Sequence, residues 1–270
     1  MSSSKDRAFS YGEDLALAHR LADAADAITL KRFQSLDLVI STKPDNTPVT
    51  DADKSSEEAI RALLHAHRPQ DGIVGEEFGN EGLERDRYWV IDPIDGTKNF
   101  LRGVPTWATL IALIERNPDG SQQTVVSVVS APALFRRWFA HLGGGAFLTL
   151  NGETIKKIHV SEISKIEDAS ISYSDFEGWG EMLTPFNNLL KSAWRTRGYG
   201  DFWSHMLVAE GALEAAIEPS LALWDMAALD LIVTEAGGIF SNTDGIVGPH
   251  GGNGVSANAV IHSRIIAALK

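Results

Sequence analysis

The chain has 270 residues, 44% of them hydrophobic, which is enough to bury one large core or two modest ones. Its formal net charge of -12 opposes an extended nucleic-acid contact, because such contacts need lysine and arginine to displace counterions. It contains no cysteine, which excludes disulfides, thiolate metal sites and thiol nucleophiles. Any catalysis must therefore use oxygen and nitrogen groups.

The first residues, MSSSKDRAF, carry charges without a following apolar run. No later stretch reaches the length of uncharged residues that a membrane helix needs. We therefore expect neither secretion nor a membrane span, and the cytoplasm is the expected location.

Two amphipathic helices are predicted in the first part of the chain. Apolar residues recur at three- and four-residue steps from Tyr11 to Phe33, and a second helix is expected over Asp51 to His67 with Thr50 or Asp51 as its cap. The segment between them is interrupted by Pro44 and Pro48, and we expect an exposed polar loop there.

Strand patterns follow these helices. The apolar runs at 73–74 and 88–91 each end in acidic residues, which places carboxylates at strand ends. From Trp107 to Leu150, several β-rich runs separated by turns predict an antiparallel sheet. After Asn151, strand and helix patterns alternate, so we expect an N-terminal α+β part (1–150) and a C-terminal α/β part (151–270).

The strongest chemical signal is WVIDPIDGTKNF, in which Asp92 and Asp95 flank a proline at a strand end. Two carboxylates on one turn repel unless a cation lies between them, and such an oxygen-rich site suits magnesium. The N–H groups of Gly96 and Thr97, at an expected helix start, would add an anion site. A bare DPxD, taken alone, is more often only a tight turn.

Other acidic residues support the metal interpretation, although each also has a structural alternative. Glu76 and Glu77 follow the run GIVG but could belong to a solvated loop. Asp225 lies near the start of an apolar helix and could be a helix cap, as could Asp53 after PVT.

In combination, VTDAD, GEE, WVIDPIDGT and WDMAA resemble the inositol monophosphatase family of metal-dependent phosphatases. The resemblance extends from residues 49–53 to TEAGG at 234–238 and implies an α/β fold with αβαβα layers. It implies that the first part contains most metal ligands and the second part the substrate-specificity residues and Asp225.

The resemblance also implies roles for the site residues. Glu76, Asp92 and the backbone carbonyl of Ile94 would hold one magnesium ion, and Asp92, Asp95 and Asp225 a second. A third, looser ion would lie near Glu76. Thr97, oriented by Asp53, would activate the attacking water, and the Gly96 and Thr97 N–H groups would hold the phosphate of a small-molecule monoester.

Asp201 and Glu218 are the expected contacts of the organic part of the substrate. The resemblance places Glu218 beside the alcohol, and Asp201 adds a carboxylate where inositol-phosphate enzymes carry a small or hydroxyl residue. Two carboxylates favour a cationic substrate. Together with RTRGYGDFWSHMLVAEG and GPHGG, they resemble the histidinol-phosphatase branch of the family. Asp201 could instead be an ordinary helix cap.

Two alternatives stay open at this point. One is an inositol or broad sugar-phosphate phosphatase of the same family, and the other is a non-catalytic, RNA-associated regulatory member, which the -12 charge opposes. A homodimer is expected from the resemblance. We interpret Arg195 and Arg197 as surface salt-bridge partners and Trp107 as a core residue. The role of His250 in its glycine-rich loop is open.

Overall fold

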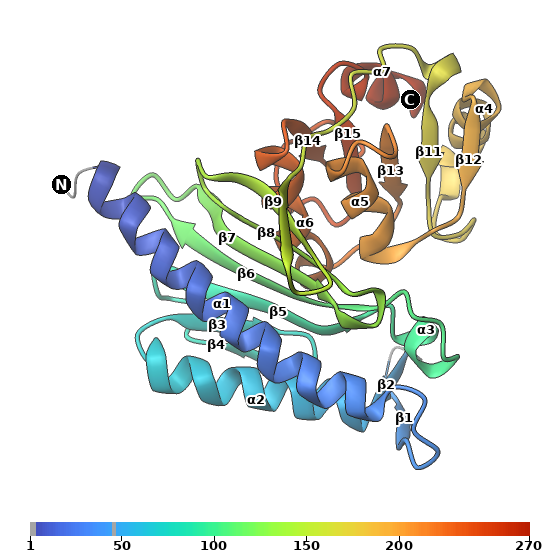
Figure 1. Ribbon diagram of the computed structural model, residues 1–270. Helices are drawn as coiled ribbons and strands as arrows, with labels where there is room; N and C mark the ends of the chain where they lie inside the picture. The colour runs from blue at the N-terminus through green and yellow to red at the C-terminus, as the bar shows by residue number, and fades with distance from the viewer. Residues whose placement is uncertain (1–3, 45–46) are drawn as a thin grey trace.

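The chain folds into alternating layers of helices and sheets (Figure 1), and this computed structural model describes residues 4–44 and 47–270. Helices α1 (Ser4–Arg32) and α2 (Asp51–His67) cover one face of a large sheet. Helices α5 (Asp201–Ala209) and α6 (Leu223–Glu235) lie between this sheet and a smaller one. Helices α4 (Leu183–Ser192) and α7 (His262–Ala268) cover the outer face of the smaller sheet. The predicted αβαβα layers are confirmed.

The large sheet, within the described residues, has the strand order β10-β9-β8-β7-β6-β5-β3-β4, and only β3 and β5 pair in parallel. Its central strands are apolar almost throughout, because helices cover both faces. The antiparallel sheet predicted between Trp107 and Leu150 is confirmed. The strands are β3 (Gly72–Gly75), β4 (Gly79–Glu81), β5 (Arg87–Asp95), β6 (Ala108–Arg116), β7 (Gln122–Ala131), β8 (Arg136–His141), β9 (Gly145–Leu150) and β10 (Thr154–Lys157).

The smaller sheet has the order β12-β11-β13-β15-β14 in the described chain. Strand β11 pairs in parallel with β12 and β13, and β15 pairs antiparallel with β13 and β14. Strands β12, β14 and β15 were not predicted, because segments this short carry little periodicity. The strands are β11 (Ser170–Ser172), β12 (Arg195–Arg197), β13 (Ala215–Glu218), β14 (Gly238–Ser241) and β15 (Gly254–Asn258).

Two small elements border the space between the sheets at one end of the molecule. A hairpin of β1 (Ile40–Thr42) and β2 (Pro48–Thr50) leads into α2, and Thr50 rather than Asp51 caps that helix. The short helix α3 (Thr97–Leu101) follows β5. Residues 45 and 46 of the expected exposed loop lie outside the described residues.

The two halves of the chain share one apolar core. Helix α6 packs on the large sheet, so that Ile232 and Val233 belong to the same buried cluster as Val129 and Trp138. The large sheet also continues through β10, beyond residue 150. The division into parts 1–150 and 151–270 stays a prediction. None of the described helices combines the length and the apolar composition needed to cross a membrane.

Candidate active site

Strand β5 brings two carboxylates to the same place at its end. Residues three apart on a regular strand point to opposite faces, so Asp92 and Asp95 would normally diverge. The pairing register shifts between them, so that three steps along β5 match two steps along β6. This extra residue is a β-bulge, and Thr109 stabilises it by donating a hydrogen bond to the Pro93 carbonyl at 2.8 Å. The acidic motif is therefore a bulge rather than a simple turn.

Helix α6 supplies a third carboxylate to this place. Asp225 lies in the first turn of α6, and its Oδ2 accepts a hydrogen bond from the Ala222 N–H at 2.7 Å. The helix-cap interpretation of Asp225 is correct but incomplete. One carboxylate oxygen from each of Asp92, Asp95 and Asp225 lies within 4.8 Å of the other two.

The three aspartates are unfavourable neighbours in the absence of a cation. Burial raises the pKa of Asp92 and Asp95 well above the usual range, and the surrounding carboxylates raise it further. Burial also raises the pKa of Asp225 to about 6. A divalent cation among these oxygens would relieve the repulsion, and Mg²⁺ prefers carboxylate ligands. The donor set fits such an ion.

Glu76 approaches Asp92 from the loop after β3. After burial, the charge of Glu76 is the next cause of the raised pKa of Asp92. The Oε1 atom of Glu76 lies 2.7 Å from Lys43 Nζ, which pairs equally closely with Glu77. Lys43 comes from the segment expected to be an exposed polar loop, yet its side chain is largely buried against the two glutamates. The role of Glu76 as a metal ligand stays a prediction.

Thr97 and Asp53 meet although they are far apart in the chain. Gly96 adopts a left-handed backbone (φ 83°) that turns the chain into α3. Thr97 Oγ1 then lies 3.3 Å from Asp53 Oδ1 and 3.0 Å from the Ile94 carbonyl oxygen. Asp53 Oδ2 accepts the Thr50 N–H at 2.8 Å as part of the capping box of α2. Asp53 thus caps its helix and also contacts Thr97.

Glu57, which was not predicted from the sequence, holds the loop that carries Glu76. Its fully buried carboxylate accepts hydrogen bonds from the Glu77 N–H at 2.7 Å and from Arg61 Nε at 2.8 Å. Gly75 leaves it room, since a Cβ there would lie 1.9 Å from Glu57 Oε1. The sequence signal was weak because Glu57 is one of two adjacent glutamates on an amphipathic helix.

Asp201 and Glu218 lie together on the other side of the site. Ser174 joins them, because its Oγ donates to Glu218 Oε1 at 2.8 Å and accepts the Asp201 N–H at 3.1 Å. Asn99 donates to Asp201 Oδ2 at 3.1 Å. The helix-cap interpretation of Asp201 is wrong, since Gly200 is the N-cap of α5 and the first N–H groups of that helix donate to Ser174 and Asp95 instead.

The electrostatics of this second pair also favour a cation. Burial raises the pKa of Asp201 to about 6 and that of Glu218 to about 8. Asp201 has a φ of 49°, which is unusual for a residue other than glycine, and its contacts hold this conformation. An ammonium group between the two carboxylates would favour their ionised forms.

One cavity of about 620 Å³ connects the two sides. Residues from both halves of the chain line it, and they include predicted and unpredicted positions. Lys98 and Asn99 follow the metal motif directly and could have been proposed from it, whereas Ser174 joins the site only through tertiary packing. The predicted residues lining it are Glu76, Gly96, Thr97, Asp201 and Asp225, and the unpredicted ones include Lys98, Asn99, Ser174, Asp175 and Trp224.

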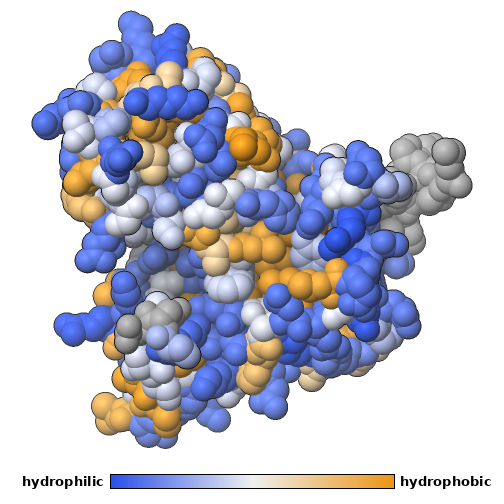
Figure 2. Space-filling view, turned by 180° about the vertical axis from the view of Figure 1, so that it is seen from behind, coloured by the Kyte–Doolittle hydropathy of each residue, from blue (hydrophilic) through white to orange (hydrophobic). Residues whose placement is uncertain are grey.

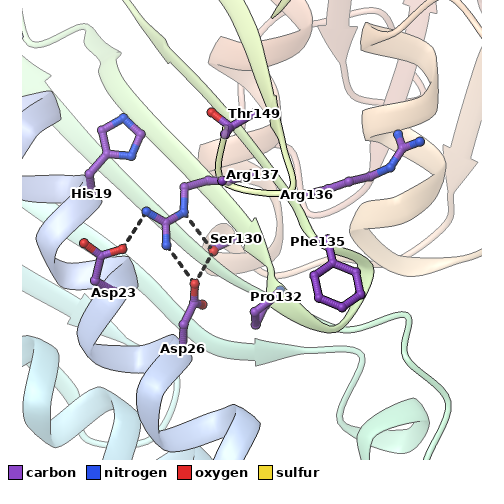
Figure 3. A pocket seen from close by; sticks show the side chains of 10 residues that line it. His19, Asp23, Asp26, Ser130, Pro132, Phe135, Arg136, Arg137 and Thr149 are labelled. Atoms are coloured by element: carbon purple, nitrogen blue, oxygen red, sulfur yellow. Dashed lines mark hydrogen bonds and ion pairs between the residues drawn. The ribbon is translucent and has the colours of Figure 1, made fainter. Parts of the chain in front are cut away.

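A separate cavity of about 350 Å³ lies between α1 and the large sheet (Figure 3). Arg137 there pairs with Asp23 at 2.8 Å and with Asp26 at 2.7 Å. Arg137 thus has two carboxylate partners within the protein. None of the predicted site residues lines this cavity.

Several predicted positions do not line the main cavity. Trp107 is fully buried and packs on Phe33 and Phe100, which confirms its core interpretation. Arg195 donates to the Tyr199 hydroxyl at 3.0 Å. Neither Arg195 nor His250 lines the main cavity.

Comparisons with known proteins identify the family of this chain. The model of the inositol monophosphatase family matches residues 11–270. The chain belongs to the inositol monophosphatase family. It is 54% identical to a histidinol-phosphatase of Streptomyces coelicolor, over 96% of this chain and 97% of the relative. A histidinol-phosphatase of Mycobacterium tuberculosis is 50% identical over 95% and 98%.

A solved structure also matches this member of the inositol monophosphatase family. The extragenic suppressor protein SuhB of Bartonella henselae superposes with a TM-score of 0.84 at 28% identity, over 96% of this chain and 98% of that one. The fold and the relatives together identify the chain as a phosphoric monoester hydrolase, as predicted.

The role of Glu57 can be tested by replacement with glutamine. Both partners of the Glu57 carboxylate are hydrogen-bond donors. In Glu57→Gln, the amide NH₂ would face one of these donors, and a buried donor left without an acceptor costs about 1–3 kcal/mol. We expect a lower melting temperature and weaker magnesium activation of phosphate release. The matched control is Glu58→Gln at the neighbouring exposed position. Equal behaviour of the two variants would contradict the assigned role.

The raised pKa of Glu218 predicts a pH-dependent effect on stability. Its folded-state pKa of about 8 exceeds the ordinary value of 4.5. The unfolded state therefore ionises at lower pH than the folded state, and the free energy of unfolding falls as the pH rises from 4.5 to about 8. In EDTA, the melting temperature of Glu218→Gln minus that of wild type should therefore rise with pH across this window. Exposed Glu153→Gln is the control. A difference that does not change with pH would count against the buried, unpaired state of Glu218.

Proposed function

We propose that this enzyme hydrolyses L-histidinol phosphate to L-histidinol and inorganic phosphate with magnesium as its cofactor. The observation that carries the proposal is that Ser174 joins Glu218 to Asp201, which lines the same cavity as Asp225. L-histidinol phosphate carries an ammonium group that would neutralise these carboxylates. The proposal is supported by the two relatives named histidinol-phosphatase, at 54% and 50% identity.

The carboxylates described above would hold the metal. In this proposal Glu76, Asp92 and the Ile94 carbonyl bind one ion, Asp92, Asp95 and Asp225 bind a second, and a third lies near Glu76. When bound, magnesium neutralises phosphoryl oxygens and increases the acidity of water. Lys43 already places a positive charge at Glu76 Oε1, so an ion there would compete with this lysine.

Thr97 and Asp53 would orient the attacking water. The Thr97 hydroxyl has one hydrogen to donate, to either Asp53 Oδ1 or the Ile94 carbonyl, and its lone pairs can accept a hydrogen from water. Burial raises the pKa of Asp53, which improves it as a proton acceptor. Water would attack phosphorus in line with the leaving oxygen, so that the ester P–O bond breaks as the new one forms.

The phosphate itself would be held at the start of α3. The first N–H groups of a helix have no acceptor within it, so those of Gly96 and Thr97 would be available to phosphoryl oxygens. Among the described residues that line this cavity, Lys98 is the only lysine or arginine. A phosphate bound here would meet positive groups on this side and the Asp201–Glu218 pair on the other.

We also propose that the enzyme forms a homodimer, that it acts in the cytoplasm and that it has no nucleic-acid partner. The family resemblance supports the dimer. The net charge of -12 supports a small-molecule substrate rather than an extended phosphate backbone.

The metal requirement can be tested at Asp92. Asp92→Asn removes a charge shared by both proposed ions, and phosphate release with magnesium should fall below about 1% of wild type. EDTA should abolish wild-type release, and added magnesium should restore it. Asp119→Asn, at an exposed loop position, is the control and should behave as wild type. Near-normal turnover by Asp92→Asn would refute the metal assignment.

The substrate can be tested by comparing kcat/KM for L-histidinol phosphate, inositol 1-phosphate, fructose 1,6-bisphosphate and an adenosine bisphosphate. We expect a large preference for the first. Asp201→Asn should lower kcat/KM for L-histidinol phosphate about thirtyfold or more, because the substrate ammonium would lose one of its carboxylate partners. The variant should leave kcat/KM for inositol 1-phosphate unchanged. Comparable rates on all substrates in wild type would favour a broad polyol-phosphate phosphatase, and equal losses in the variant would exclude Asp201 as the selective contact.

A further inference from the structure

Another cavity lies away from the candidate active site. It has a volume of about 380 Å³ and is bordered by the start of β7, by α6 and by the loop between β14 and β15. Leu142, Leu231 and Pro249 give it apolar walls, and Val247 on its border is strongly exposed, as is the adjacent Ile246. Figure 2 shows hydrophobic residues exposed at the waist between the two parts of the molecule.

Asp230 places a carboxylate in this cavity, whose other lining residues are all neutral. Its hydrogen-bond partner among the described residues is the Thr124 hydroxyl, at 3.3 Å, and no described lysine, arginine or histidine forms an ion pair with it. Burial raises the pKa of Asp230 to about 7. Ionising a buried carboxylate that has no counterion is costly. A cation bound beside Asp230 would therefore favour its ionised form.

The cavity beside α1 (Figure 3) provides a contrast. Its partly buried Asp26 is paired with Arg137, and its Arg136 is paired with Glu210 at 2.7 Å. Both arginines of that cavity thus have carboxylate partners within the chain. The residues that line the Asp230 cavity include no lysine or arginine, so a cation that pairs there with ionised Asp230 would come from a bound ligand.

We propose that the Asp230 cavity binds a small organic monocation, with a primary ammonium group at the Asp230 carboxylate and an apolar body against Leu142, Leu231 and Val247. The ammonium would replace the missing counterion, and the apolar body would cover exposed hydrophobic surface. This site is distinct from the cavity that Asp201 lines, and the two cavities share no residue. It does not depend on the identity of the phosphate ester.

The test is calorimetric titration of the magnesium-loaded enzyme with phenethylammonium at pH 8, where Asp230 is ionised. We expect saturable binding that is at least about tenfold weaker in Asp230→Asn, which removes the charge and keeps the shape. The neutral analogue 2-phenylethanol should bind more weakly than the ammonium to wild type. Asp201→Asn should retain the binding that Asp230→Asn loses, which separates this site from the catalytic cavity.

A second variant tests the site without changing Asp230, so that misfolding of Asp230→Asn cannot be the sole cause of lost binding. Val247→Trp at the exposed border should block the cavity and leave the melting temperature unchanged. Retained binding in both Asp230→Asn and Val247→Trp would overturn the proposal. Loss of binding in Asp201→Asn alone, or no saturable binding by wild type at millimolar probe, would overturn it as well.

Discussion

The repulsion among buried carboxylates is the constraint on which this structure depends. Asp92, Asp95 and Asp225 lie close together in a place that raises the pKa of each. Folding must therefore hold in place side chains that would separate in water. The same crowding favours the binding of divalent cations, because folding has already brought the ligands together before an ion binds.

Backbone hydrogen bonds oppose this repulsion. Asp92 accepts the Ile94 N–H at 3.0 Å, Asp95 accepts the Phe202 N–H, and Asp225 accepts the Ala222 N–H. Each aspartate thus accepts a backbone hydrogen bond and is also a member of the cluster. For Asp225, the helix-cap and the metal-ligand interpretations therefore do not exclude each other.

The layered fold separates the two parts of the chemistry. In the proposed mechanism, the end of β5 and the start of α3 provide the phosphate side, and the first residue of α5 and the last residue of β13 provide Asp201 and Glu218 on the organic side. The residues proposed to contact the leaving group thus come from other elements than the bulge in β5. Family members can therefore differ in substrate while keeping one hydrolytic site.

The sequence by itself determined the helices over 51–67 and around Asp225, the buried antiparallel sheet and the acidic positions at strand ends. These features follow from local periodicity and from motifs whose residues are adjacent in the chain. Tertiary structure alone decided that Lys43 pairs with Glu76, that the buried Glu57 rather than Glu58 holds the loop, and that Ser174 joins Asp201 to Glu218. Such contacts join residues far apart in sequence, and their side chains have the same composition and local pattern whether they face solvent or the site.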